Sequence, residues 1–269
     1  MRKSPKRRFF VIVSHMRIST SEIKWQTFRL AVTEYLPEVI NHEVLILHGA
    51  GEAEQSRTKN LATALTILNC RTITFDFVSH RLSSGALSDL TLKKRSEQAL
   101  TVYKHFALSS NCILLGFSMS GQTAVDLMTM LDGQVSTLAL FAPAFYDKDA
   151  RTAHFGPDFS SIIRKDESWK RSDAWEKMSK FRGALITFES PLDSIVPDMV
   201  IDLLQKSAIN ATLRLRVRVK NAPHTMALWS SQDPLRAEWF ADTIVRAAEG
   251  VSKPDIDLAQ KIGIELELL

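Results

Sequence analysis

Short apolar runs alternate with longer amphipathic segments from about residue 40 onward, and this alternation constrains the fold more than any other feature of the chain. Apolar runs predict strands at residues 44–47, 72–77, 112–116, 135–141 and 184–188. Apolar positions at helical spacing predict helices at residues 53–68, 92–106, 119–131, 197–206 and 239–248. Such alternation is typical of a mostly parallel sheet with helices on both faces. We therefore predict an α/β fold, built as one domain over residues 1–269.

Three segments need separate interpretations. Residues 212–220 alternate strictly between apolar and cationic side chains. This predicts an edge or near-edge strand whose cations guard it against pairing with other chains, which we favour over a stripe that binds acidic ligands. Residues 145–180 are densely charged and rich in aromatics, and we expect a small helical lid that its aromatics anchor to the core. Residues before 40 are expected to add antiparallel strands at one sheet edge.

The formal charge of +4 comes from the first few residues. Five of the 34 basic residues lie at positions 2–8, which leaves 29 against 30 acidic residues, or −1 for the rest. A neutral body argues against a nucleic-acid partner, and a solvated arm is favoured over adhesion to an anionic surface. The apolar run at residues 9–13 is shorter than the roughly 7–15 residues of a secretory signal. We expect a cytoplasmic protein with no membrane span.

The sequence Gly-Phe-Ser-Met-Ser-Gly at residues 116–121 follows a predicted buried strand and precedes a predicted helix. A serine in this context is typical of a nucleophile elbow, where a tight turn strains the backbone and exposes the hydroxyl. Small residues are needed two positions to either side, and Gly116 and Ser120 meet that need. We predict that Ser118 is a nucleophile, in preference to a structural serine in a turn.

An oxyanion needs hydrogen-bond donors beside the nucleophile. The Gly-rich loop His-Gly-Ala-Gly at residues 48–51 follows an earlier predicted strand. We predict that the backbone N–H groups of Ala50 and Met119 form the oxyanion hole and so bind the substrate carbonyl. Phosphate binding is the alternative for such a loop, but no Lys-Ser or Lys-Thr pair follows it.

The acid and base should follow the nucleophile in the chain. His224 lies in a loop after the alternating segment and is the only histidine beyond residue 154, so we predict that it is the base. Asp193 is the predicted acid, in preference to Asp198, which a helix dipole would explain, and to Glu189. His48 is interpreted as a buried, hydrogen-bonded support.

These motifs together resemble the α/β-hydrolase superfamily, particularly its monoacylglycerol lipase and serine aminopeptidase-like branch. The resemblance covers residues 44–248, although Ser79, Arg81 and Ser120 stand where glycines are usual. It implies that the strands beginning near Cys70 and Cys112 flank the one that ends at His48. Two strand spacings of about 9.6 Å in total exceed the roughly 7 Å limit for a disulfide, so two buried thiols are expected.

The function that follows is hydrolysis of a carboxylic ester or thioester, with an amide less favoured, through an acyl-enzyme on Ser118. The partner is a small-molecule acyl substrate, and no metal or organic cofactor is implied. Two alternatives stay open: an acyltransferase with the same triad, and a non-catalytic ligand-binding member of the fold. A lid of this size, with Met119 and Met226 closing the pocket, predicts short or medium acyl chains. The oligomeric state is left open.

Overall fold

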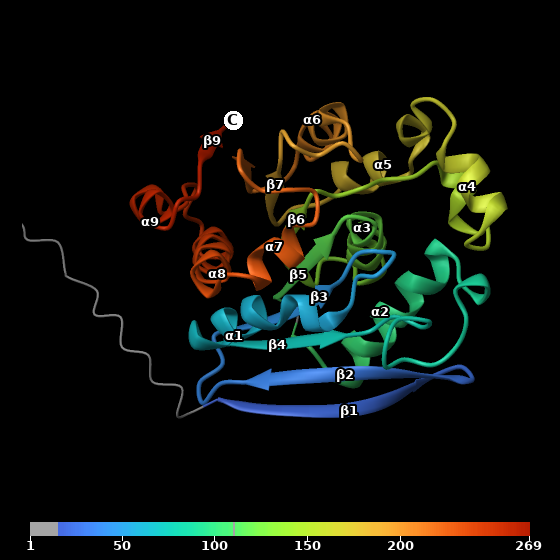
Figure 1. The fold of residues 1–269 in the computed structure, drawn as a ribbon, viewed down its shortest axis with the longest axis horizontal. Coiled ribbons are helices and arrows are strands. Elements are labelled where there is room, and N and C mark those ends of the chain that lie inside the picture. The colour runs from blue at the N-terminus through green and yellow to red at the C-terminus, as the bar shows by residue number, and fades with distance from the viewer. Residues whose placement is uncertain (1–15, 110) are drawn as a thin grey trace, which may run out of the picture.

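The computed structural model describes residues 16–109 and 111–269, so the basic tail at residues 2–8 and the apolar run at residues 9–13 lie outside the described residues. The strands of the described part are β1 (Arg17–Trp25), β2 (Phe28–Leu36), β3 (His42–Leu47), β4 (Cys70–Phe75), β5 (Cys112–Phe117), β6 (Val135–Phe141), β7 (Ala184–Glu189), β8 (Leu213–Val219) and β9 (Leu266–Leu268). They form one nine-stranded sheet in the order β1-β2-β4-β3-β5-β6-β7-β8-β9 (Figure 1).

Six neighbouring strands run parallel, namely β4, β3, β5, β6, β7 and β8. At the two sides of this group, β2 pairs with β4 and β9 pairs with β8, both antiparallel. Every residue of β5 and of β7 is buried. Strands of this kind read as continuous apolar runs because helices cover both faces of the sheet. The predicted fold class, a mostly parallel sheet between helices, is confirmed.

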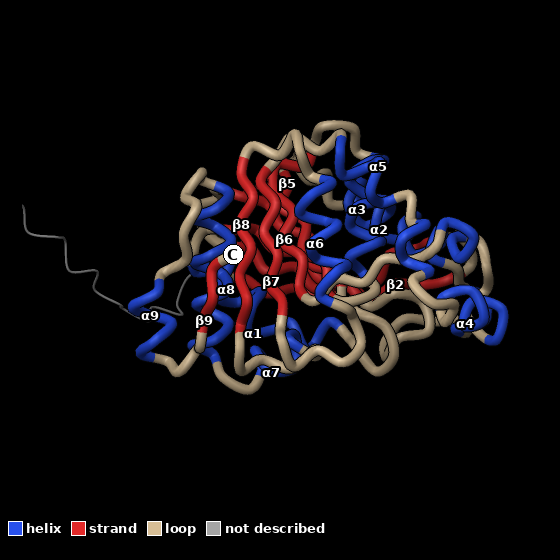
Figure 2. Tube along the Cα trace, turned by 90° about the horizontal axis from the view of Figure 1, so that it is seen from above, coloured by secondary structure: helices blue, strands red, loops and turns tan. Residues whose placement is uncertain are grey.

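Helices lie on both faces of the sheet. They are α1 (Lys59–Ile67), α2 (Leu92–His105), α3 (Ser120–Met130), α4 (Pro157–Ile163), α5 (Ala174–Ser179), α6 (Asp198–Ser207), α7 (Met226–Ser231), α8 (Pro234–Ala248) and α9 (Ile256–Lys261). One buried cluster joins α2, α3 and α6 to the sheet, and a second joins α1, α7 and α8 to the other face (Figure 2). One detail differs from the sequence interpretation: α6 begins at Asp198, and Pro197 precedes it with an extended backbone.

The sequence predicted the edge of the sheet formed by β1 and β2, but it did not predict β9 at the other edge. The antiparallel strands expected before residue 40 are present as β1 and β2. β8 lies next to the edge, as its alternation predicted, but its cations do not guard an open edge because β9 pairs with it. Instead they bind carboxylates: Arg216 contacts Glu189 at 2.9 Å and Asp202 at 2.6 Å, and Arg218 contacts Glu189 at 2.9 Å.

The segment 145–180 contains only short helical pieces, namely α4, α5 and 3₁₀ turns at Lys148–Arg151 and Ser168–Arg171. Its large aromatics are buried or pack against the core cluster on the α2 and α3 side: Phe145, Tyr146, Phe155, Phe159, Trp169 and Trp175. Lys177 also reaches the buried carboxylate of Asp126 on α3, at 2.5 Å. The predicted anchoring of this segment by its aromatics is confirmed.

The two cysteines lie on β4 and β5, the strands that flank β3. Both are buried, free thiols, as the resemblance implied. Burial raises the pKa of the Cys70 thiol to about 12, so it stays protonated at neutral pH. Within the described residues, no helix is both long enough and apolar enough to cross a bilayer.

Candidate active site

Ser118 occupies a strained turn between β5 and α3. Its φ of +49° lies in the left-handed region, which non-glycine residues rarely adopt. A Cβ on Gly116 would lie 2.5 Å from the backbone oxygen of Ser120, and a Cβ on Gly121 would lie 2.5 Å from Pro143. The turn therefore requires glycine at both positions, and the strained backbone predicted for the elbow is confirmed.

The structure brings together the three residues predicted to form the triad. Nε2 of His224 lies 3.0 Å from Oγ of Ser118, and Nδ1 of His224 lies 2.7 Å from Oδ2 of Asp193. The three residues come from the loops after β5, β7 and β8, which end at the same edge of the sheet because these strands are parallel. In the sequence, Ser118 lies 106 residues and Asp193 lies 31 residues before His224. The parallel topology brings these distant positions together.

The environment of Asp193 keeps its carboxylate ionised. Burial by itself would raise the pKa of Asp193, but hydrogen bonds from His224 and from the N–H groups of Val196 and Ile195 outweigh burial and lower it. An ionised Asp193 accepts a hydrogen bond from the Nδ1–H group of His224, so Nε2 is left as the acceptor that faces Ser118. This is the tautomer that a general base needs.

The loops of the acid and the base are tied to each other and to the end of the chain. The Ser190 hydroxyl donates to the backbone oxygen of Ala222, which links the two loops. Asn221 donates to the backbone oxygen of Gly263 at 2.7 Å and accepts from the N–H of Glu265. His224 thus follows a loop that the C-terminal segment holds in place.

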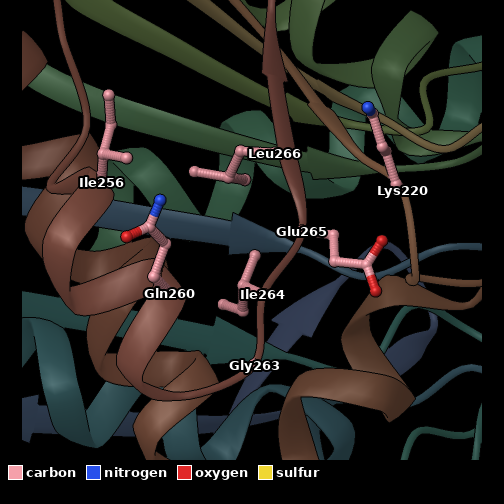
Figure 3. A pocket seen from close by; sticks show the side chains of 8 residues that line it. Lys220, Ile256, Gln260, Gly263, Ile264, Glu265 and Leu266 are labelled. Atoms are coloured by element: carbon pink, nitrogen blue, oxygen red, sulfur yellow. The ribbon is translucent and has the colours of Figure 1, made fainter.

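A groove lies between α9 and β9, and it adjoins this bracing segment. Figure 3 shows Ile256 and Gln260 of α9 on one side, and Ile264 and Leu266 on the other. Lys220 completes its wall at the end of β8. None of the predicted site residues lines this groove, so it is separate from the candidate active site.

The competing carboxylates have other partners. Asp198 is the first residue of α6, is more than half exposed and lies 3.6 Å from Arg218. Glu189 is buried and binds Arg216 and Arg218. The carboxylate that contacts His224 in the described part of the chain is that of Asp193.

The two predicted oxyanion donors lie in peptide groups whose carbonyls are anchored on the opposite side. The Ser118 oxygen, which shares a peptide group with the Met119 N–H, accepts from Gly121 at 2.8 Å and from Ala144 at 2.9 Å. A Cβ built on Gly49 would lie 3.5 Å from Cβ of Ser118, so the loop that carries Ala50 passes directly beside the nucleophile. The N–H groups of Ala50 and Met119 thus stay the predicted oxyanion donors.

His48 is buried and neutral, as its interpretation as a support requires. Burial lowers the pKa of His48 well below its usual value, and nearby Arg95 and His80 lower it further. The N–H of Phe77 donates to Nε2 of His48 at 3.2 Å, so the ring proton lies on Nδ1. Nδ1 then donates to the oxygen of Gly49 at 2.8 Å.

The sequence interpretation missed Arg95, a fully buried arginine on α2. Its guanidinium lies below the loop at residues 48–51 and beside Ser120 of the elbow. A signal was available: Arg95 shares the helical face of Leu92, Ala99 and Val102, which are all buried. A charged residue on the apolar face of a helix indicates a specific partner in the core.

No protein-family model matches the chain, and no curated protein matches its sequence. Solved structures match it closely in architecture. Est1E from Butyrivibrio proteoclasticus, solved with ferulic acid, has a TM-score of 0.65 and 16% identity, over 84% of this chain and 99% of that chain. The chain has the α/β-hydrolase fold.

Two further structures with the α/β-hydrolase fold match to a similar degree. An esterase from Exiguobacterium antarcticum has a TM-score of 0.60 and 16% identity, over 82% of this chain and 96% of that chain. The thioesterase domain from the curacin biosynthetic pathway has a TM-score of 0.62 and 13% identity, over 85% of this chain and 99% of that chain. At these identities the likeness is one of fold, and function has to be argued from the site.

Proposed function

We propose that this protein is a serine hydrolase that cleaves a carboxylic ester or thioester. The observation that carries the proposal is the continuous hydrogen-bond chain from Ser118 through His224 to Asp193, with the serine on a strained elbow. The order of these residues in the chain, serine then aspartate then histidine, is the order usual for this fold. Structural neighbours that are an esterase and a thioesterase support the same class of reaction.

The residues would divide the reaction into two acyl transfers. The Oγ of Ser118 attacks the acyl carbon while Nε2 of His224 takes the hydroxyl proton, and the N–H groups of Ala50 and Met119 bind the oxyanion. Collapse of this intermediate breaks the bond to the alcohol or thiol, which leaves with the proton from His224. Water then repeats the attack with His224 as the base, so a free acid departs and Ser118 regains its proton.

The experiment that tests the proposal is turnover of a panel of soluble esters, thioesters and amides, with the acyl product identified by mass spectrometry. We expect free acid from esters or thioesters, at rates well above the rates for amides. A product joined to an added alcohol or amine in preference to water would indicate an acyltransferase. Absence of turnover and of covalent labelling across the panel would contradict catalysis and favour a ligand-binding protein.

The assignment of the acid is tested by a pair of matched substitutions. We expect Asp193→Asn to lower kcat by up to about 10⁴, because the amide no longer fixes the tautomer of His224. Asp198→Asn should change kcat very little, since its carboxylate is exposed and contacts Arg218. Steady-state kinetics of both variants on one ester decides the matter. A larger loss of kcat in Asp198→Asn than in Asp193→Asn would indicate that Asp198 is the acid.

The acyl chain should be short or medium in length. The segment 145–180 begins beside the elbow, where the N–H of Ala144 donates to Ser118 and that of Tyr146 to Gln122. We propose that this segment acts as a lid over a limited pocket, because its aromatics hold it against the core. We expect kcat/KM for p-nitrophenyl esters to fall as the acyl chain lengthens, with poor turnover of triolein emulsions. Strong interfacial activation on triolein, with slow turnover of short esters, would indicate a true lipase instead.

A further inference from the structure

Arg95 has a buried guanidinium group without a carboxylate partner among the described residues. Its Nη2 donates to the backbone oxygens of His48 at 3.0 Å and Gly49 at 3.3 Å, and to Oγ of Ser120 at 3.0 Å. The guanidinium carbon lies 3.7 Å from the ring centroid of Phe77, so the group stacks on an aromatic face. Nε and Nη1 have no hydrogen-bond partner in the described part of the chain.

Stability alone gives a poor reason for this arrangement. Burial lowers the pKa of Arg95 to about 9, which still leaves the guanidinium charged at neutral pH. A buried charge without an opposite charge is unfavourable, and an apolar side chain of similar volume would pack in the same space at less cost. Among the described residues, the hydrogen bonds of the Arg95 guanidinium all go to the oxyanion loop at residues 48–51 or to Ser120 of the elbow, so the charge acts on these two segments.

The contact with Gly49 controls the proposed oxyanion donor. The oxygen of Gly49 and the N–H of Ala50 belong to one planar, trans peptide group, so they point in opposite directions. The oxygen accepts from Arg95 and also from Nδ1 of His48, which fixes the peptide plane from one side. The Ala50 N–H is thereby held pointing to the other side, and a cation on the oxygen polarises the peptide and strengthens the N–H as a donor.

The contact with Ser120 links the two halves of the oxyanion hole. The Ser120 hydroxyl donates to the oxygen of His48 at 2.5 Å and accepts from Arg95. Serine at this elbow position, where the family usually has glycine, thus joins the loop after β3 to the first residue of α3. Arg95 and Ser120 set the spacing between Ala50 on one side and Met119 on the other.

We propose that Arg95 is a positioning residue for the oxyanion hole, which aligns and polarises the Gly49–Ala50 peptide from beneath. This inference rests on the proposed function, because it gives Arg95 a part in stabilising the tetrahedral oxyanion. The interaction strengthens as charge develops on the substrate oxygen, so it acts on the transition state more than on the bound substrate.

The test compares Arg95→Met, Arg95→Gln and Arg95→Lys with Arg71→Met, a control that removes an arginine paired with Glu34 and Glu43 far from the site. Arg71 also lies near a phenylalanine ring and also donates to a backbone oxygen, that of Phe106, but it lies at the opposite end of the strands. For the two neutral variants we expect kcat to fall by about 10- to 100-fold with little change in KM, somewhat less than the roughly 10²–10³ for a direct donor. Arg95→Lys should recover part of the loss, because it keeps the charge without the planar fork.

A second readout separates this role from mere support of the fold. A trifluoromethyl ketone adds the serine hydroxyl and forms a hemiketal whose oxyanion occupies the hole, whereas the product acid binds without that adduct. We expect the inhibition constant of the ketone to rise by the same factor as kcat falls, and that of the product acid to stay constant. The melting temperature of each variant shows whether it is folded. If Arg95→Met does not fold, Arg95→Gln is the neutral variant on which the comparison is made.

The outcomes distinguish this inference from the proposed function. If the wild-type protein turns over esters but the folded neutral variants keep wild-type kcat and ketone affinity, the role of Arg95 is wrong and the hydrolase proposal stands. Equal losses of affinity for the ketone and for the product acid would also overturn it, because they indicate a general collapse of the pocket. If the wild-type protein neither turns over esters nor binds the ketone, the proposed function fails, and this inference with it.

Discussion

We expect Ser118→Ala to abolish covalent labelling by a fluorophosphonate probe and to lower ester turnover by about 10⁶, as loss of a triad nucleophile does. The substitution removes the hydroxyl oxygen that lies 3.0 Å from Nε2 of His224. It keeps the Cβ, so the strained turn is not altered and the melting temperature should change little. Labelling followed by mass spectrometry of the modified peptide measures both the loss and the position of the adduct.

A matched control for this experiment is Ser161→Ala on α4. Its exposed hydroxyl contacts only the backbone oxygen of Asp158 among the described residues, so labelling and turnover should equal those of the wild-type protein. Undiminished labelling of the Ser118 variant would show that another residue is the nucleophile. The proposal for Ser118 would then be wrong even if the protein hydrolysed esters.

The second large effect is expected for His224→Ala. Removing the imidazole leaves Ser118 without an acceptor for its proton, so kcat should fall by about 10⁴ or more. Labelling by the fluorophosphonate should become slow without disappearing, because the hydroxyl is still present.

His105→Ala provides the comparison for the histidine experiment. His105 is an exposed residue at the last position of α2, and its ring contacts Phe106. Its loss should leave kcat unchanged. An equal loss of activity in the two histidine variants would show that the assay reports stability and would contradict the role given to His224.

The parallel core of the sheet was predictable because burial on both faces leaves a strong pattern. β5 is apolar throughout and β7 is apolar except for Thr187 and Glu189, while α2 and α6 carry apolar residues at helical spacing, so the apolar pattern located all four elements. The C-terminal elements α9 and β9 were not predicted. They have only six and three residues, too few for either period to stand out. The guard role given to the cations of β8 was wrong for the same reason, since β9 was missing from the interpretation.

The candidate site was only partly accessible from sequence. Ser118, Asp193 and His224 each lie where a known fold expects a role, and their contacts in the structure agree with the roles proposed. Arg95 has no such motif, because its contacts depend on how far α2 lies from the loop after β3. The distance between α2 and this loop depends on how all the helices on that face pack against the sheet. In the sequence, the one trace of it is a charged residue on the apolar face of α2.

The anchoring of Asn221 to residues 263 and 265 has a consequence for the order in which the protein matures during synthesis. The nucleophile, the oxyanion loop and the acid all precede residue 200, so they can fold while the chain is still being made. The loop before His224 obtains its two supports only after residues 263 and 265 have been synthesised. A nascent chain that ends before residue 263 would therefore hold the elbow beside an unbraced base, and we expect the proposed activity to develop only after residues 263 and 265 have been added.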